Sequence, residues 1–228
     1  LFFIACLPYL KDFGVTLDDE TYYLNGLNTF NYVKSLILSI SNPKINVDLY
    51  REKIEEWPII FEFFLVILSK IFGIQSIDKI YLFSHQINFF IFCLSLIFFY
   101  KLIKLRYNNV FYSFLSIIFI ILSPRIFGES FYNTRDIFFM SLFIIYIYFV
   151  YNFLQKRNIT NIIIFSFFTA LLLNTKILGI IPIFFYIILY IYSFLNTQKK
   201  LSKEKNIVFL FFFFTTISIY FFCSYFWY

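Results

Sequence analysis

The chain has 228 residues, of which 61% are hydrophobic and only 14% are charged, and its mean hydropathy is +0.80. A soluble domain is nearer about half apolar and about a quarter charged, so this composition excludes an ordinary soluble core and predicts an all-α, polytopic bundle of transmembrane helices. The net charge of +6 does not indicate nucleic-acid binding, because the basic residues lie between apolar runs rather than on one face.

Six apolar runs are candidate membrane spans, because about 20 apolar residues cross the roughly 30 Å of hydrocarbon in a bilayer. They are Tyr81–Ile103, Asn109–Ser123, Ile137–Leu154, Ile162–Leu173, Ile177–Leu195 and Ile207–Tyr228. The fourth run is too short by itself, so we expect Asn174 and Thr175 to extend it. Leu1–Leu10 is expected to be the end of a first span. Residues 1–228 are predicted to form a single transmembrane domain, with about six spans in residues 80–228, that is a fragment of a longer protein.

Residues 11–79 form a long first loop in this scheme. Within it, Pro58–Ile74 is apolar but carries Glu62 and Lys70 in a run of roughly 17 residues, near the lower limit for a span. An amphipathic segment of this kind lies along the membrane surface more readily than it crosses the bilayer. We therefore expect interfacial helices in the first outer loop, with Pro58–Ile74 as one of them.

Charged residues are divided unequally between the two sides of the predicted spans. The turns on one side carry nine basic residues, namely Lys101, Lys104, Arg106, Lys156, Arg157, Lys199, Lys200, Lys203 and Lys205. The short turns on the other side carry three, namely Arg125, Arg135 and Lys176. The positive-inside rule places the first side in the cytoplasm and the second on the outer face. We expect a bacterial inner membrane, of which the outer face is the periplasmic side. Twelve of the thirteen acidic residues then lie on the periplasmic side, so acid or metal chemistry is expected there.

Asp18, Asp19 and Glu20 stand together just after the first apolar segment. Adjacent carboxylates repel one another unless a proton or a cation relieves them. Such a cluster supplies a general base for a hydroxyl group, or oxygen ligands for a divalent metal ion, with Asp19 and Glu20 as the candidate ligands. The alternative is a solvated turn that begins a helix, because Asp and Glu favour helix N-termini. Both interpretations stay open at this point.

A second polar segment, Ser123–Asp136, places Arg125, Glu129, Arg135 and Asp136 in one predicted outer turn. Arginine binds phosphate oxygens through two parallel hydrogen bonds, so this turn is a candidate site for a lipid-linked phosphate. The alternative is a polar loop in which an Arg–Asp pair only holds two helix ends together.

Two single residues extend this candidate site. Lys176 lies at another predicted outer junction, where it either meets a phosphate or simply reaches the membrane surface. His85 lies near the outer start of its span, and a lone histidine of this kind is more often a satisfied hydrogen-bonding residue than a ligand.

Together these segments resemble the C-type membrane glycosyltransferases, in particular the group of protein mannosyltransferases and aminoarabinose transferases. The resemblance rests on Asp19-Glu20 followed by Tyr23, the interfacial helix Pro58–Gly73, a span with His85 and Lys101–Arg106 at its ends, the segment Ser123–Asp136, and Thr175, Lys176 and Gly179. These features occur in the family's order over nearly the whole chain. The additional acid Asp18 leaves open which carboxylate is catalytic.

The resemblance implies an enzyme that moves a sugar from a polyprenyl-phosphate donor to an acceptor hydroxyl at the outer membrane face, with inversion. It implies that Asp19 is the base, that Glu20 supports it or binds a metal ion, and that Asp136 is a second catalytic carboxylate. The residues implied to contact the donor are Arg125, Arg135, Lys176, His85 and Tyr23.

The implied partners are the lipid-linked donor, a lipid, glycan or protein acceptor, and membrane lipids, without nucleic acid. The one cofactor that these acidic residues could bind is a divalent metal ion. The competing hypothesis is a transporter or lipid-flippase subunit, which predicts ionisable residues in the middle of the spans.

Overall fold

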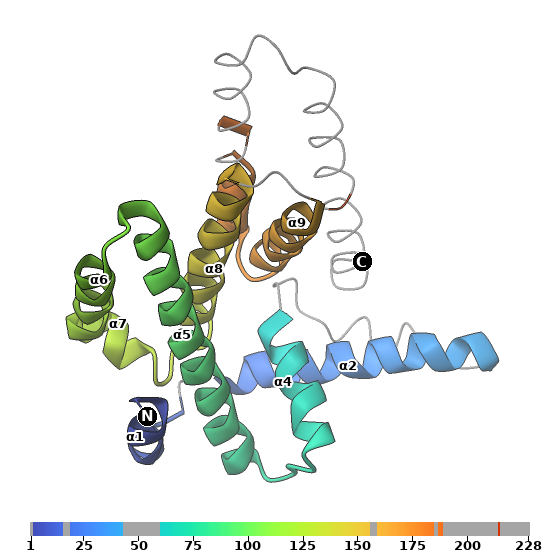
Figure 1. Cartoon of the computed structure of the whole chain (residues 1–228). Helices are drawn as coiled ribbons and strands as arrows, with labels where there is room; N and C mark the ends of the chain where they lie inside the picture. Colours follow the sequence, from blue (N-terminus) through green and yellow to red (C-terminus); the bar gives the residue numbers. More distant parts are fainter. Residues whose placement is uncertain are drawn as a thin grey trace.

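The computed structural model describes residues 2–15, 19–42, 60–155, 159–184, 187–188 and 214 (Figure 1). Its elements are helices, and no strand occurs within these ranges. In chain order they are α1 (Phe2–Cys6), the 3₁₀ helix η1 (Leu7–Asp12), α2 (Asp19–Ser41), α4 (Ile60–Ile71), α5 (Ile77–Tyr107), α6 (Val110–Leu122), α7 (Pro124–Glu129), α8 (Asp136–Gln155), α9 (Ile159–Leu173) and the 3₁₀ helix η2 (Ile177–Ile180). The predicted all-α class is confirmed.

Two helices, α5 and α8, are long and apolar enough to cross a membrane, with 31 and 20 residues. They contain the predicted spans Tyr81–Ile103 and Ile137–Leu154. Two further apolar helices, α6 and α9, have 13 and 15 residues. The predicted spans Ile177–Leu195 and Ile207–Tyr228 lie largely outside the described residues, so the total number of spans stays a prediction.

The end of α9 corrects one expectation. Asn174 and Thr175 do not extend this helix, which ends at Leu173 and gains its additional length at its N-terminal end. The Thr175 amide donates to the carbonyl of Leu172 (3.1 Å), and the Thr175 hydroxyl donates to the carbonyl of Leu171 (2.7 Å). The hydroxyl thus satisfies a carbonyl that has lost its helical partner, which allows the chain to leave the helix at this point.

The central packing runs from α6 through α5 and α8 to α9 (Figure 1). Large aromatic side chains fill it: Tyr146 and Phe165 are fully buried between α8 and α9, and Phe89 and Phe92 are fully buried on α5. Between membrane-spanning helices such side chains stabilise the packing through van der Waals contacts, because lipid tails are as apolar as the side chains themselves. The Tyr146 hydroxyl donates to the carbonyl of Pro182 (2.9 Å), so this buried polar group has a partner.

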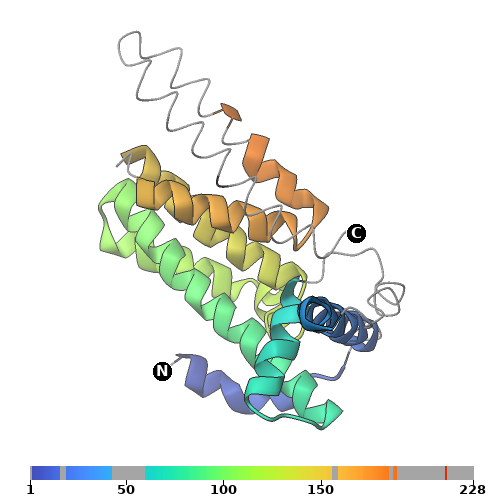
Figure 2. The ribbon, with the colours of Figure 1, turned by 90° about the vertical axis from the view of Figure 1, so that its right-hand side faces the viewer.

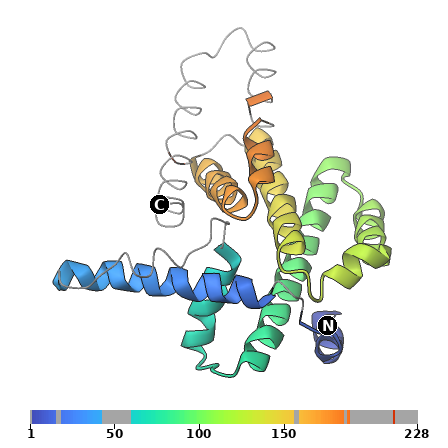
Figure 3. The ribbon, with the colours of Figure 1, turned by 180° about the vertical axis from the view of Figure 1, so that it is seen from behind.

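The first loop contains two helices, α2 and α4, which pack against each other at one end of the bundle. Figure 1 shows α2 starting beside α5 and passing behind α4, and in Figure 2 the same helix is seen end-on. Seen from behind in Figure 3, α2 extends away from the bundle and α4 crosses it. The expected helix within Pro58–Ile74 is present as α4; its position along a membrane surface stays a prediction.

A glycine determines how closely α2 and α4 approach. A Cβ atom added to Gly26 would lie 2.8 Å from the backbone carbonyl carbon of Glu62. Real Cβ contacts essentially never reach this distance, so a larger residue would push the two helices apart. Gly26 therefore sets the position of Glu62 relative to α2.

Charges of different kinds occupy the two ends of α5 and α8. Asp78 and Asp136 lie in the first turns of these helices, and the described acids of α2, α4 and α7 lie around the same end. Lys104 and Arg106 lie in the last turn of α5, at the opposite end. For the residues it describes, the structure therefore separates the predicted outer charges from the predicted inner ones.

Candidate functional site

A small cavity of about 10 Å³, room for about one water molecule, lies at the end of the bundle where α2, α4 and α5 meet the turn before α8. Among the side chains that line it are Asp19, Tyr22, Tyr23, Glu62, His85 and Thr134. Asp19 and Glu20 stand in the first turn of α2, where acidic residues favour the positive end of the helix dipole. Of the two, Asp19 lines the pocket, whereas the Glu20 side chain is exposed. The structure thus brings together three predicted site residues, Asp19, Tyr23 and His85.

Glu62 is the most deeply placed acid of this pocket. It is only 4% exposed, and its carboxylate Oε1 lies 3.5 Å from Nε of Arg135. Burial raises the pKa of Glu62, and the charge of Arg135 opposes that rise. The guanidinium carbon of Arg135 also lies 3.3 Å from the ring centroid of Tyr22. Arg135 is therefore held between a carboxylate and an aromatic face, two environments that stabilise a planar cation.

Sequence reasoning used Glu62 only as an argument against a membrane span, and it missed this position in the site. The signal was present in the helical period. Glu62 lies on the same face of α4 as Leu65, Val66 and Ser69, at spacings of three, four and seven residues, and all four are buried. An acid on the buried face of an amphipathic helix needs a partner, and only the tertiary structure identifies that partner as Arg135.

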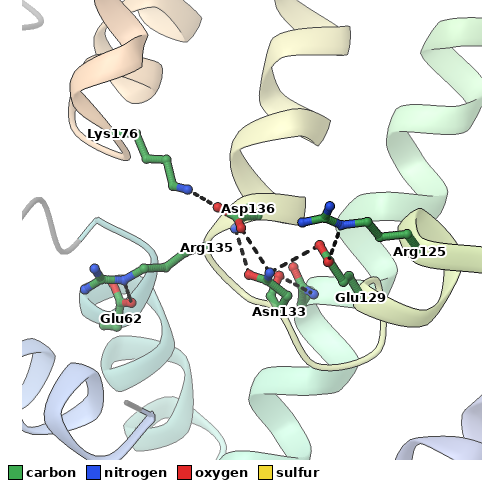
Figure 4. A network of polar contacts seen from close by, with 8 residues as sticks. Glu62, Arg125, Glu129, Asn133, Arg135, Asp136 and Lys176 are labelled. Atoms are coloured by element: carbon green, nitrogen blue, oxygen red, sulfur yellow. Dashed lines mark hydrogen bonds and ion pairs between the residues drawn. The ribbon is translucent and has the colours of Figure 1, made fainter. Parts of the chain in front are cut away.

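A second group of polar contacts runs along the turn before α8 (Figure 4). Arg125 pairs with Glu129 across 2.9 Å, one helical turn apart on α7. Asn133 donates from Nδ2 to Asp136 (3.1 Å) and, more weakly, to Glu129 (3.4 Å). Asp136 in turn forms an ion pair with Lys176. These polar contacts therefore form one continuous series that connects α7, the start of α8 and the turn after α9.

The cations in this series of polar contacts differ in their exposure to solvent. The Arg125 side chain is 85% exposed, whereas that of Lys176 is 31% exposed. Burial lowers the pKa of Lys176, and the nearby charge of Arg135 lowers it further. Lys176 and Arg135 thus form a positive pair beside the pocket, and Arg125 lies at its periphery. The alternative interpretation of this turn expected an Arg–Asp pair; the arginines pair instead with glutamates, and Asp136 pairs with Lys176.

His85 lies on α5, 3% exposed, and its ring approaches the backbone of Leu10 as a hydrogen-bonding partner. Asp19 is close enough to act on it electrostatically. Within the described ranges no group of three or more His, Cys, Asp or Glu side chains suits a metal ion. Asp18 lies outside the described residues, so the metal-binding alternative for the first acidic cluster stays a prediction.

Comparison with known families decides the class of protein. Residues 56–222, more than half of the chain, match the family described as dolichyl-phosphate-mannose-protein mannosyltransferase. The chain belongs to this family. The predicted resemblance is confirmed, and the protein is a membrane glycosyltransferase of the C type. Neither a curated protein nor a solved structure matched it.

The mannosyltransferase-family match covers one part of the candidate site and not the other. It contains Glu62, His85, the turn with Arg125, Arg135 and Asp136, and Lys176. Asp19, Glu20 and Tyr23 lie before its first residue. The roles of these three residues therefore rest on their position in the pocket and on the sequence pattern.

Proposed function

We propose that this mannosyltransferase-family protein transfers a sugar from a polyprenyl-phosphate donor to an acceptor hydroxyl, with inversion, at the outer membrane face. One observation carries the proposal: Asp19 lines a pocket at the end of the bundle where Arg135 and Lys176 also lie. A base close to paired cations is what this transfer needs, because the acceptor loses a proton while the leaving phosphate gains negative charge.

Asp19 is the base in this proposal. Its carboxylate lines the pocket, whereas the neighbouring Glu20 carboxylate is exposed. An acceptor hydroxyl that reaches Asp19 at the edge of this small cavity would donate its proton to the carboxylate as its oxygen attacks the anomeric carbon. Glu20 adds negative charge beside the base without contacting the reacting atoms.

Arg135 and Lys176 are the phosphate-binding residues of the proposal. Each already has a carboxylate partner, Glu62 for Arg135 and Asp136 for Lys176. These carboxylates hold the two cations in position and leave other donor hydrogens of the guanidinium and ammonium groups for phosphate oxygens. Asp136 is therefore assigned as a positioning residue for Lys176, and Glu62 as the positioning residue for Arg135.

The sequence of α8 disfavours the competing transporter or flippase hypothesis. Transport pathways are marked by ionisable residues within the spans. Between Asp136 and the end of α8 at Gln155 no such residue occurs. The one charged residue of α8, Asp136, lies in its first turn, where a donor entering from the bilayer would present its phosphate.

The donor and the stereochemistry are tested together. Membranes that contain the full chain are given the same radiolabelled sugar either as a polyprenyl monophosphate or as a nucleotide conjugate, and the product's anomeric configuration is determined by NMR. The proposal expects transfer from the polyprenyl phosphate only, with inversion. Transfer from the nucleotide sugar, or retention of configuration, would refute it.

Orientation is tested by cysteine labelling in a cysteine-free background. Gln75 and Arg106 are both exposed and stand near opposite ends of α5. In intact bacterial cells an impermeant maleimide should label Gln75→Cys and not Arg106→Cys, because the positive-inside rule places Arg106 in the cytoplasm. Labelling of the second variant alone would reverse the proposed topology.

A further inference from the structure

A second pocket lies at the opposite end of the bundle, between the last turns of α5 and the middle of α8. Its volume is about 310 Å³, and it is lined by Lys101, Lys104, Leu105, Asn108 and Tyr148. Two ammonium groups, a side-chain amide and a phenol therefore line one cavity. These groups are suited to a small anion with several oxygen atoms.

Tyr148 and Lys101 of this cavity share Phe98 as a neighbour, and Asn108 has a defined backbone conformation. The Tyr148 ring packs edge-on against Phe98 with centroids 5.2 Å apart, and Nζ of Lys101 lies 5.5 Å from the Phe98 centroid. Asn108 ends α5 in the left-handed conformation, with φ of 49°, and its backbone N–H donates to the carbonyl of Lys104. The cavity is thus built from two helices and a defined turn, and is more than a set of unrelated surface lysines.

Charge at this end is uncompensated within the part of the chain that the structure describes. The described acids, namely Asp12, Asp19, Glu20, Glu62, Asp78, Glu129 and Asp136, belong to the elements at the other end. None of these described carboxylates competes for Lys101 and Lys104, in contrast to Arg135 and Lys176. An anionic ligand would therefore bind without first displacing an internal partner.

The surroundings of the cavity indicate what kind of anion it takes. Leu105 is 49% exposed, and the nearby Tyr107 and Phe111 are 61% and 68% exposed. These exposed apolar side chains, of which Leu105 itself lines the cavity, suit hydrocarbon chains. We propose that the cavity binds the phosphate of an anionic phospholipid, whose acyl chains lie against the exposed apolar residues. A basic pocket between helices at the membrane surface is a setting in which lipid headgroups bind.

This inference does not depend on the proposed transfer reaction or on which side of the membrane the cavity faces. Lysines at the end of a helix also favour the helix dipole and the observed topology, without any bound lipid. That simpler role requires only charge. It does not require Tyr148, so the phenol distinguishes a built site from charge alone.

The test measures phosphatidylglycerol binding to the full chain in phosphatidylcholine nanodiscs, by native mass spectrometry of the released complexes. The variants are Lys101→Gln/Lys104→Gln, Tyr148→Phe, and the matched control Lys11→Gln/Lys79→Gln, which removes two exposed lysines at the other end. At about 1 kcal/mol for each lysine near the surface, the first variant should weaken binding roughly 30-fold at low salt. Tyr148→Phe should weaken it less, and the control should leave it unchanged.

Two results would overturn the proposal. An equal loss in the control variant would mean that general surface charge, and not the cavity, attracts the lipid. Inorganic phosphate that binds the detergent-solubilised protein as well as phosphatidylglycerol does would mean that the ligand is a free phosphate. Retained phosphatidylglycerol in the wild type, its loss in the double lysine variant, weaker binding by Tyr148→Phe and an unaffected control would together support a phospholipid site.

Discussion

The two ends of α5 and α8 carry basic residues in opposite circumstances. At the end near α2 and α4, Arg125, Arg135 and Lys176 each face a carboxylate. At the other end, Lys101 and Lys104 line a cavity to which the described residues contribute no carboxylate. The comparison indicates that the role of a basic residue at a membrane surface depends on whether a carboxylate lies beside it. A buried partner positions it for one geometry, and without a partner it is available to anions from outside.

The difference also concerns rigidity. Arg135 is restrained by Glu62 and Tyr22, and Glu62 is restrained in turn by the close approach of Gly26. A preorganised cation stabilises charge in a transition state without reorganisation during the reaction. The exposed lysines at the other end have no comparable restraint in the described structure. Variants that remove one group at a time should therefore affect the two ends differently.

The largest effect is expected from the proposed base. Asp19→Asn keeps the size and much of the hydrogen bonding of the side chain but removes its ability to accept a proton. The rate of sugar transfer at saturating donor should fall by about 10²–10⁴. Glu20→Gln, in the same turn but exposed, is the matched control and should retain most of the rate. An Asp19→Asn variant with near-normal turnover would exclude Asp19 as the base.

Lys176→Ala should act mainly on donor binding. A hydrogen bond to a charged group contributes about 1.5–3 kcal/mol, so the apparent KM for the donor should rise roughly 10- to 150-fold. Arg106→Ala removes a cation from the opposite end and should leave this KM unchanged. Steady-state kinetics with purified polyprenyl-phosphate sugar would show the difference. A fall in kcat with an unaltered KM would contradict the assignment of Lys176 to the donor phosphate.

Gly26→Ala should loosen the packing of α2 on α4. Its Cβ would overlap the backbone of Glu62, and overpacking of this kind lowers the free energy of unfolding by about 1–3 kcal/mol. Gly128→Ala on α7 is the control, because no atom lies within 4 Å of its added Cβ. Chemical unfolding in detergent compares the two. Equal stability of both variants would show that α2 and α4 are not held at the described distance.

The stability of the protein should depend on pH through Glu62. A carboxyl group whose pKa is raised by folding binds more protons in the folded state than in the unfolded state. The free energy of unfolding therefore falls as the pH rises above 4.5, the ordinary pKa of a glutamate side chain. The slope is at most about 1.4 kcal/mol for each pH unit. Unfolding measured at several pH values should show this slope in the wild type and its absence in Glu62→Gln. Identical profiles would show that burial does not affect the charge of Glu62.

Arg125→Ala should have the smallest effect. Its side chain is 85% exposed and pairs only with Glu129 on the same short helix, and exposed pairs contribute about 0–1 kcal/mol. The apparent donor KM should therefore change less than roughly fivefold. A loss as large as that of Lys176→Ala would move the phosphate site away from Arg135 and toward α7.

The sequence by itself determined the class of fold, the positions of the α5 and α8 helices and the separation of charge between their ends. These properties depend on composition and on local patterns: long apolar runs form helices wherever water is absent, and the charges that flank them remain at the ends. The family resemblance was also readable, because its segments occur in order along the chain. The matched residues 56–222 confirm it.

Only the tertiary structure decided which charges meet. Glu62 and Arg135 are separated by more than seventy residues, and Asp136 and Lys176 by forty, so no local period relates them. The packing of α4 on α2 at Gly26 positions Glu62, and the packing of α8 on α9 brings Asp136 near Lys176. Helix packing depends on side-chain shape in three dimensions, whereas a helix forms from contacts within one short segment, and this is why the pairs were not predicted.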